Sequence, residues 1–391
     1  MTLQDSITSF SEYIENYILP SFKDSLDEQI VIWGTGNCGQ GLYHLLRKKY
    51  KVVSFCDGLI KKRSAMFDLE VDTPSNVFLK YPNATYLVAS TGCVGNVIEQ
   101  NAKSIDANLK VKRLSDQECF LAVQYNYLQN QCQNDPVAFT YKWLELYRKL
   151  QSQGQLAVMQ KELLSYFDDD LSKDIINTRI DAFTSGDVAK VFDIKLTDNQ
   201  YFSKDCVALT DSEVFIDCGA YDGDSIRAFL NCTQGKYKQI IAIEPDPCNF
   251  QKLYAMAVRD DLVGFRGIKS VTGASNGTIS FAVNLGTSSK VSEVNEGLDT
   301  IEMRMLKLDN LYNEKPTYIK MDIEGAELDT LKGCERIIKD LKPKLAICVY
   351  HKPFDIFDIP KYLKSLVPEY KFKLRQHQLG FCEVVLYASV D

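Results

Sequence analysis

Two acids and two glycines between residues 214 and 245 have the types and the spacing of a cofactor-binding site. Asp217 ends a short apolar run, Gly219 and Gly223 lie in the turn that follows, and Glu244 ends the next apolar run. Glycines allow a ligand to approach the backbone closely, and an acid at the second strand end can accept hydrogen bonds from a ribose. The stretch therefore predicts a strand, a turn, a helix and a second strand that bind a nucleotide-like cofactor.

The turn itself differs from that of a dinucleotide-binding site. Its spacing is G-x-x-x-G, and it carries Asp222 and Asp224, which would repel a pyrophosphate but suit a cationic ligand. S-adenosylmethionine has a sulfonium, an ammonium and a ribose but no phosphate, so we expect this cofactor; capping of the helix is the alternative role for the two aspartates. The predicted cofactor-binding residues are Asp217, Gly219, Ala220, Tyr221, Gly223, Asp224, Glu244 and Pro245.

Two later apolar runs also end on residues that can do chemistry. Asp322 ends the run 318–321, Glu324 lies in the next turn, and His351 ends the run 345–350. Ligands of open α/β sheets bind beyond the carboxyl ends of the strands, so we predict Asp322, Glu324 and His351 as catalytic residues. The ordinary pKa of a histidine suits a general base, although His351 could instead be a structural hydrogen-bonded residue. Lys320 is expected on the same side of its strand as Asp322, where the two would form an ion pair.

Residues near the predicted site could bind the substrate or a metal. Tyr201 precedes the first cofactor strand, where an aromatic side chain can close over a ligand, and Ser288 lies in a polar segment expected to form a loop over the site. We therefore predict both as substrate-binding residues. Glu324 and Glu327 could bind a metal, but the helix expected over 326–340 offers no matching histidine or second carboxylate pair, so no metal is expected.

A second glycine-rich turn lies near the amino terminus. Gly34, Gly36 and Gly39 form a true G-x-G-x-x-G between an apolar run and a helical pattern, and Asp57 ends the next apolar run. This turn has no acid, so a phosphate can lie there. With Phe55-Cys56-Asp57, it resembles the nucleotide-sugar-binding domain of bacterial sugar-modifying enzymes. A NAD-dependent sugar dehydrogenase, a non-catalytic nucleotide-sugar-binding protein and a structural module without a ligand remain alternatives.

The apolar patterns around these residues predict an α/β fold with two Rossmann-like domains joined by a helical connector. The second domain is expected to hold a mostly parallel seven-stranded sheet with an antiparallel terminal hairpin. A further hairpin is expected around 275–277. The expected divisions are an amphipathic helix in 1–29, a nucleotide(-sugar)-binding domain over 30–115, the connector over 116–185 and the second domain over 186–391.

Composition limits the environment and the partners. The net charge is −7 and no basic stripe stands out, which argues against a nucleic-acid partner. No apolar run is long enough to span a membrane, and no signal peptide is evident. The 12 cysteines are scattered singly, many inside apolar runs, as reduced thiols are. We therefore expect a cytoplasmic protein. The amphipathic helix over 3–19 is expected to pack on its own domain, with a homo-oligomer surface as the alternative role.

Three motifs resemble the FkbM-type methyltransferases. They are Asp217-Cys218-Gly219-Ala220-Tyr221-Asp222-Gly223, the run from Ile319 to Glu327 (I-K-x-D-x-E-G-x-E), and Leu331-Lys332-Gly333. The resemblance covers the chain from about residue 178 onward and implies a class I methyltransferase fold. It also implies transfer of a methyl group from S-adenosylmethionine, usually to a hydroxyl of a sugar or polyketide-like acceptor. We therefore expect an in-line O-methyltransferase acting on a sugar, nucleotide-sugar or glycan-like molecule.

Overall fold

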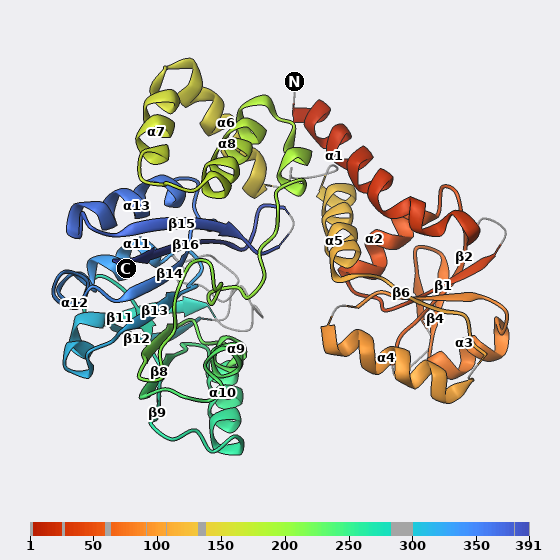
Figure 1. Cartoon of the computed structure of the whole chain (residues 1–391). Coiled ribbons are helices and arrows are strands. Elements are labelled where there is room, and N and C mark those ends of the chain that lie inside the picture. The colour runs from red at the N-terminus through yellow and green to blue at the C-terminus, as the bar shows by residue number, and fades with distance from the viewer. Residues whose placement is uncertain are drawn as a thin grey trace. The chain divides into compact units, whose positions relative to one another are not determined.

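The computed structural model describes residues 3–25, 28–58, 64–90, 92–106, 108–131, 138–282, 300–378 and 380–390. The chain divides into two compact units, and Figure 1 colours the chain by residue number. The first unit is Met1–Lys149 with Ile180–Phe192, and the second is Leu150–Arg179 with Asp193–Asp391. Both contain sheets covered by helices, so the predicted α/β class is confirmed. Ser288 lies outside the described residues.

The first unit holds a six-stranded sheet in the order β3-β4-β2-β1-β5-β6, parallel except for the β3–β4 pair. Its strands are β1 (Gln29–Trp33), β2 (Lys51–Cys56), β3 (Ser64–Met66), β4 (Leu69–Asp72), β5 (Thr85–Val88) and β6 (Val111–Arg113). Its helices are α1 (Leu3–Ile18), α2 (Asn37–Leu46), α3 (Pro74–Lys80), α4 (Gly92–Ile105), α5 (Asp116–Gln131) and most of α6 (Ala138–Ser152). The predicted amino-terminal helix is confirmed by α1, which buries Phe10, Ile14 and Ile18.

The second unit holds the predicted seven-stranded sheet, in the order β15-β16-β14-β13-β7-β8-β9. The strands are β7 (Val214–Cys218), β8 (Gln239–Ile243), β9 (Phe265–Ile268), β13 (Tyr318–Met321), β14 (Lys344–Cys348), β15 (Lys371–Gln376) and β16 (Val384–Ser389). Only β16 runs antiparallel, to both β14 and β15, so the predicted terminal hairpin is confirmed. Every residue of β7 and β13 is buried, as expected for strands covered on both faces.

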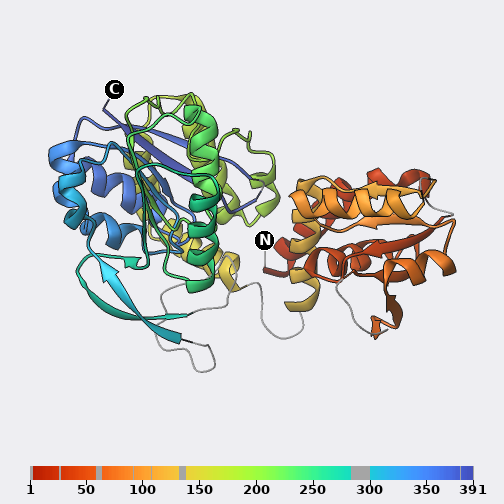
Figure 2. The same ribbon diagram turned by 90° about the horizontal axis from the view of Figure 1, so that it is seen from below.

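The directions of the crossovers in the second unit determine which face of the sheet each connecting helix covers. The chain passes from β7 through β8 to β9 in one direction along the sheet, and from β13 to β14 in the other. Because parallel crossovers are right-handed, the helices of the two halves cover opposite faces (Figures 1 and 2). The helices of the second unit are α7 (Gln155–Leu164), most of α8 (Asp170–Ser185), α9 (Asp224–Thr233), α10 (Pro247–Arg259), α11 (Glu327–Lys332), α12 (Glu335–Leu341) and α13 (Asp355–Leu366). The point where the direction changes lies between β7 and β13, which is where ligands bind in such sheets.

Two expected elements are wrong. The hairpin around 275–277 does not form with β9, which pairs with β8; instead β11 (Gly277–Ala282) pairs antiparallel with β12 (Thr300–Leu306). These strands and β10 (Val271–Thr272) form a separate three-stranded sheet, whose β11 and β12 project from the unit in Figure 2. Phe281 and Met303 are buried against Val271, and this small core selects the distant partner strand.

The single helix expected over 326–340 is also wrong, because α11 and α12 are separated at Gly333 and Cys334. A Cβ atom on Gly333 would lie 2.1 Å from the carbonyl oxygen of Gly273, so the glycine permits close backbone packing where the helix breaks. The break still leaves Leu331, Cys334 and Ile338 buried. Among the helices that the structure describes, none combines the length and the apolar character that crossing a membrane requires.

Candidate active site

The turn after β7 lies against the turn after β13, at the point where the direction of the crossovers changes. Gly219 has φ +79°, and a Cβ atom there would lie 1.9 Å from the carbonyl oxygen of Asp322. Only glycine fits this conformation and this contact. Gly223 has φ +89° and precedes the first residue of α9. Gly219 therefore brings the two predicted site segments together through backbone contact, whereas the sequence predicts that its small size makes room for the ligand.

Asp217 and Lys320 form a buried ion pair beneath these turns. The Lys320 Nζ lies 3.1 Å from Asp217 Oδ1 and donates a hydrogen bond of 2.7 Å to the carbonyl oxygen of Gly219. Asp217 also accepts a hydrogen bond from the hydroxyl of Ser225. Burial raises the pKa of Asp217, while Lys320 and Ser225 oppose that rise. Burial lowers the pKa of Lys320, but the carboxylates of Asp217 and Asp322 outweigh it, so the lysine stays charged.

This pairing corrects the expected Lys320–Asp322 ion pair. Lys320 and Asp217 occupy neighbouring strands in register, since β13 pairs with β7 through these two residues. The partner strand therefore supplies the nearest carboxylate, which the sequence alone does not reveal. The charge of Lys320 still contributes to Asp322, whose pKa is raised by burial but brought below its usual range by Lys320, His351 and Tyr201.

Glu244 lies at the end of β8 and holds the turn after β7. Its Oε2 accepts a hydrogen bond of 2.8 Å from the backbone N–H of Tyr221, and its Oε1 accepts one of 2.9 Å from that of Asp246. Burial raises the pKa of Glu244 to about 7, although these two N–H donors lower it. Pro245 follows at half-buried depth, and Ala220 is fully buried in the turn. Each carboxylate oxygen keeps a lone pair with which a ribose hydroxyl can bond.

The two acids of the turn have different surroundings. Asp222 Oδ1 lies 2.7 Å from Nη2 of Arg227 in an ion pair, so its charge is largely balanced within the protein. Asp224 is exposed at the start of α9 and accepts a hydrogen bond of 2.7 Å from the backbone N–H of Ser225. Of the two acids that suggested a cationic ligand, Asp224 is the one whose charge faces solvent.

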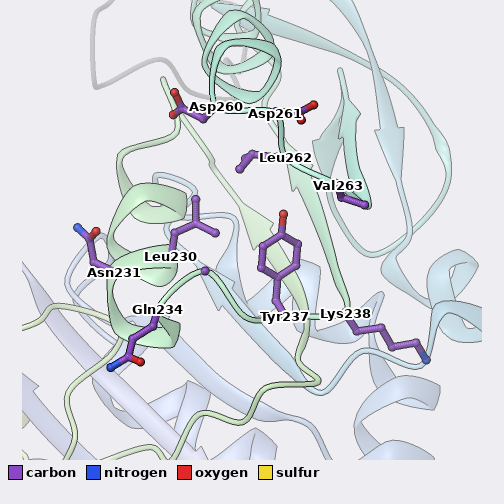
Figure 3. Close-up of a pocket in the computed structure, with 10 residues that line it drawn as sticks. Leu230, Asn231, Gln234, Tyr237, Lys238, Asp260, Asp261, Leu262 and Val263 are labelled. Carbon is purple, nitrogen blue, oxygen red and sulfur yellow. The ribbon is translucent and has the colours of Figure 1, made fainter.

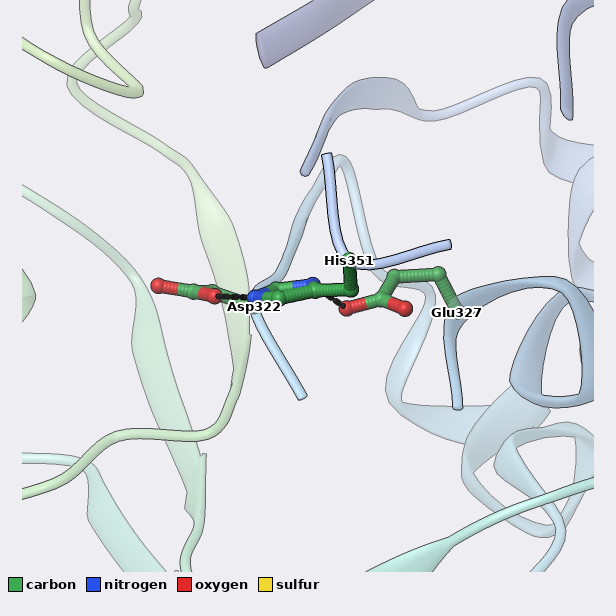
Figure 4. Close-up of side chains that lie close together, drawn as sticks. All are labelled: Asp322, Glu327 and His351. Atoms are coloured by element: carbon green, nitrogen blue, oxygen red, sulfur yellow. Dashed lines mark hydrogen bonds and ion pairs between the residues drawn. The ribbon is translucent and has the colours of Figure 1, made fainter. Parts of the chain in front are cut away.

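Asp322, His351 and Glu327 lie together beyond the ends of β13 and β14, with the imidazole between the two carboxylates (Figure 4). The Nδ1 of His351 donates a hydrogen bond of 2.8 Å to Glu327 Oε1, and its Nε2 lies 3.4 Å from Asp322 Oδ1. Glu324 Oε2 lies 3.8 Å from the same Nε2. Burial lowers the pKa of His351, but the three carboxylates, Glu327 foremost, outweigh it and raise the pKa to about 9.

Tyr201 joins the same cluster from the segment before β7. Its hydroxyl donates a hydrogen bond of 2.7 Å to Asp322 Oδ2, and Lys320 Nζ lies 5.0 Å from the centre of its ring. Its backbone has φ +67°, a conformation uncommon for a residue with a side chain. These contacts place the predicted substrate residue directly beside Asp322.

Two acids of the cluster were not among the predicted site residues. Glu327 ends the I-K-x-D-x-E-G-x-E motif, so its place in that motif was an available signal. Glu383 precedes β16, and one of its oxygens accepts a hydrogen bond of 3.3 Å from the hydroxyl of Tyr350. Burial, and next the charge of Asp322, raise the pKa of Glu383 to about 7. Nothing in the local sequence marks Glu383, because only the antiparallel β16 brings it to this edge.

The glycine turn of the first unit is also well defined. Gly34 has φ +122°, and a Cβ atom on Gly39 would lie 2.0 Å from the carbonyl oxygen of Gly34, whereas one on Gly36 would meet open space. Asp57 Oδ2 accepts hydrogen bonds from the backbone N–H (3.2 Å) and the hydroxyl (2.6 Å) of Thr35. The structure therefore brings Asp57 to the glycine turn, where it orders the turn.

A cavity of about 660 Å³ lies elsewhere in the second unit (Figure 3). Its lining residues come from the end of α9, the segment before β8, and the segment between α10 and β9. They are Leu230, Asn231, Gln234, Gly235, Tyr237, Lys238, Asp260, Asp261, Leu262 and Val263. These segments lie at the amino ends of the strands, whereas the predicted site residues lie at the carboxyl ends, so the cavity is not the candidate active site.

Comparison with known proteins finds similarity in sequence and in fold. Residues 217–374 match the family described as the methyltransferase FkbM domain. A crystal structure of methyltransferase FkbM from Methylobacillus flagellatus KT is 20% identical, with a TM-score of 0.55, over 99% of each chain. An rRNA methylase from Streptococcus thermophilus is 15% identical, with a TM-score of 0.31, over 47% of this chain and 90% of its own. No curated protein matches the chain.

The matched segment begins at Asp217 and includes Glu244, Asp322 and His351, and the M. flagellatus structure shares the fold. The chain therefore carries an FkbM methyltransferase domain and is an S-adenosylmethionine-dependent methyltransferase.

Proposed function

We propose that the protein methylates a hydroxyl group of a sugar, nucleotide-sugar or glycan-like acceptor. The observation that supports this proposal most is the cluster of Asp322, Glu324 and His351 beside the turn after β7. Several carboxylates around one imidazole offer the hydrogen-bond acceptors and the proton acceptor that a neutral, polyhydroxylated molecule requires.

On the cofactor side, the residues of the turn and the end of β8 fit S-adenosylmethionine. Glu244, with a free lone pair on each oxygen, is placed to accept hydrogen bonds from the ribose. The backbone from Gly219 to Gly223 would follow the amino-acid part, with the exposed carboxylate of Asp224 near the ammonium group. Asp217 is fully buried, with its oxygens facing Lys320 and Ser225, so we assign it to holding the turn in place.

On the acceptor side, Asp322, Glu324 and His351 would hold the hydroxyl in line behind the methyl group, and one of them would take its proton. When bound, the cofactor supplies a methyl group that bonds to the acceptor oxygen as its bond to sulfur breaks, which leaves S-adenosylhomocysteine. Tyr201 fixes the Asp322 carboxylate through its hydroxyl, and Ser288 stays a predicted contact. Correct alignment alone can supply a large part of the rate acceleration.

The test is incubation of the purified chain with methyl-labelled S-adenosylmethionine and a panel of sugars, nucleotide-sugars and glycans. We expect an O-methyl ether product. Asp322→Asn should lower turnover by about 100-fold or more while the affinity for the cofactor changes little, because general-base and positioning contributions are of that size. Glu302→Gln, which removes an exposed carboxylate on β12, is the matched control. Methylation of nitrogen or carbon, or full turnover by Asp322→Asn, would contradict the proposal.

For the first unit we propose binding of a nucleotide or nucleotide-sugar. Support comes from the glycine turn after β1, the open space beside Gly36 and the preceding parallel strands. Titration of the full chain with nucleoside diphosphates, nucleotide-sugars and NAD would separate this proposal from a dehydrogenase, since only the latter reduces NAD in the presence of a sugar. We further propose a cytoplasmic location, which the free thiols of the described cysteine side chains support.

A further inference from the structure

His351 has one ring nitrogen that the described residues do not satisfy. Its side chain is 8% exposed, and its buried Nε2 has no hydrogen-bond partner among the residues that the structure describes. The nearest acceptor oxygens are Asp322 Oδ1 at 3.4 Å and Glu324 Oε2 at 3.8 Å, and neither contact is a hydrogen bond. A buried nitrogen aimed at two carboxylates needs another partner.

The spacing of these atoms fits a bound cation. Metal bonds to histidine nitrogen and carboxylate oxygen are about 2.0–2.2 Å long, so two ligand atoms of a tetrahedral site lie about 3.4 Å apart. The distance from His351 Nε2 to Asp322 Oδ1 is 3.4 Å, and that to Glu324 Oε2 is 3.8 Å. A small shift of Glu324, whose side chain is 33% exposed, would complete the set of three.

The other ring nitrogen is held as in many metal sites. Metal-binding histidines usually donate their second N–H to a carboxylate, which fixes the ring. Glu327 does this for Nδ1 at 2.8 Å, and the same Oε1 accepts a hydrogen bond of 3.0 Å from the backbone N–H of Ile323. Glu327 is fully buried, so the ring orientation is set before any ion binds.

The charges of the cluster also favour a cation. Asp322, Glu324 and Glu327 surround one imidazole, while the buried cation of the same region, Lys320, is ion-paired with Asp217. The side chains of Asp322 and Glu324 are 25% and 33% exposed, and both lie beside the Nε2 of His351, where a metal ion would take the place of the proton. We propose that Asp322, Glu324 and the Nε2 of His351 bind one divalent transition-metal ion. The mixture of imidazole and carboxylate suits Mn²⁺ or Zn²⁺ better than Ca²⁺.

This proposal departs from the expectation that no metal binds. The sequence predicts no histidine along the helix after Glu324, but the structure supplies His351 from the segment that follows β14, the strand beside β13. The function of the ion rests on the proposed function: beyond the strand ends it would contact the acceptor hydroxyl and lower the pKa of that group. Metal binding itself does not depend on methyl transfer.

The test is titration of the full, chelator-treated chain with Mn²⁺, followed by calorimetry and by electron paramagnetic resonance. We expect one ion per chain and a ¹⁴N coupling from a histidine. His351→Gln should abolish that coupling, Asp322→Asn should weaken binding by about tenfold or more, and Glu327→Gln by about tenfold through the ring orientation. Asp211→Asn removes a carboxylate that is 78% exposed and should bind as wild type does.

Absence of saturable Mn²⁺ and Zn²⁺ binding, or binding unchanged in both His351→Gln and Asp322→Asn, would overturn the proposal. Circular dichroism identifies variants that fail to fold; Glu324→Gln, in a partly exposed turn, then provides the decisive loss of affinity. Cofactor binding is measured separately in the same samples. Cofactor binding without metal binding refutes the metal site alone, whereas metal binding without methyl transfer to any hydroxyl refutes the proposed function alone.

Discussion

Glu244 is a buried carboxylate that accepts hydrogen bonds from the backbone. It is 5% exposed, and it holds the turn after β7 through two backbone N–H groups. Burial raises its pKa to about 7, so the carboxylate takes up a proton just below neutral pH. Protonation would remove an acceptor that a ribose hydroxyl needs.

We therefore expect the affinity for S-adenosylmethionine to fall as the pH is lowered from about 7, toward tenfold per pH unit. The ionised form binds and the protonated form does not, so affinity should be constant above that pKa. Calorimetry at several pH values measures this. Glu244→Gln should bind about tenfold or more weakly at pH 8 and show a flat pH profile, while Glu302→Gln keeps the wild-type profile. A sloping profile in Glu244→Gln would assign the titration to another group.

We expect the ion pair of Asp217 and Lys320 to contribute to the stability of the fold rather than to contact a ligand. Lys320→Met leaves the fully buried Asp217 without its cation, which typically costs about 3–5 kcal/mol. Urea unfolding measures the loss. The double variant Asp217→Asn/Lys320→Met removes both charges and should recover much of the free energy of unfolding. Lys339→Met, which breaks an exposed pair with Glu335, is the control and should change the unfolding midpoint little. Equal losses in the single and double variants would argue against the pair.

Among the elements, the close approach of the turns after β7 and β13 organises the site. Gly219 lies at that approach, and its conformation and its contact both exclude a side chain. Gly235 shares a left-handed backbone, with φ +74°, but a Cβ atom there would meet nothing within 4 Å. Substituting each glycine in turn therefore separates the free-energy cost of the backbone conformation from the cost of the steric contact.

Gly219→Ala should cost roughly 2–5 kcal/mol, because steric overlap with the Asp322 carbonyl adds to the conformational penalty. Gly235→Ala should cost about 1–2 kcal/mol. Denaturant unfolding compares the two, and cofactor titration should show a loss of affinity only in Gly219→Ala. Similar behaviour of both variants would mean that the turns separate easily and that their contact does not shape the site.

For the molecule as a whole, the two units are interlaced along the chain. Helix α7 and most of α8 belong with the methyltransferase unit, whereas residues 180–192 belong with the first unit. Asp169 lies 2.8 Å from the buried Arg375 guanidinium, and the hydroxyl of Ser172 accepts a hydrogen bond of 2.8 Å from the backbone of Leu374. Arg179 donates one of 2.9 Å to the carbonyl of Phe381. The start of the second domain at residue 186 stays a prediction, and removing the residues that make these contacts tests it.

A fragment of residues 186–391 should unfold at a temperature about 10 °C or more below that of residues 150–391, since it loses several of these buried contacts. The full chain serves as the reference, and thermal unfolding by circular dichroism measures all three. The longer fragment should bind S-adenosylmethionine with the affinity of the full chain. Equal stability of the two fragments would support a domain that begins near residue 186.

The sequence by itself determined most of the elements and their order in both units. The alternation of apolar runs with glycine turns and helical periods depends on neighbours close in the chain, so α1, the strand–turn–helix units after β1 and β7, and the terminal hairpin could all be predicted. The acids at the strand ends could be predicted equally well as site residues, because the carboxyl ends of parallel strands meet at one edge of the sheet.

Only the tertiary structure decided which of these groups face one another. Lys320 pairs with Asp217 because β13 lies beside β7, and His351 lies between Asp322 and Glu327 because β14 lies on the other side of β13. The partner of β11 was missed for the same reason, since β12 follows after a long intervening segment. A pairing between distant segments depends on the packing of the whole sheet, and no local pattern records it.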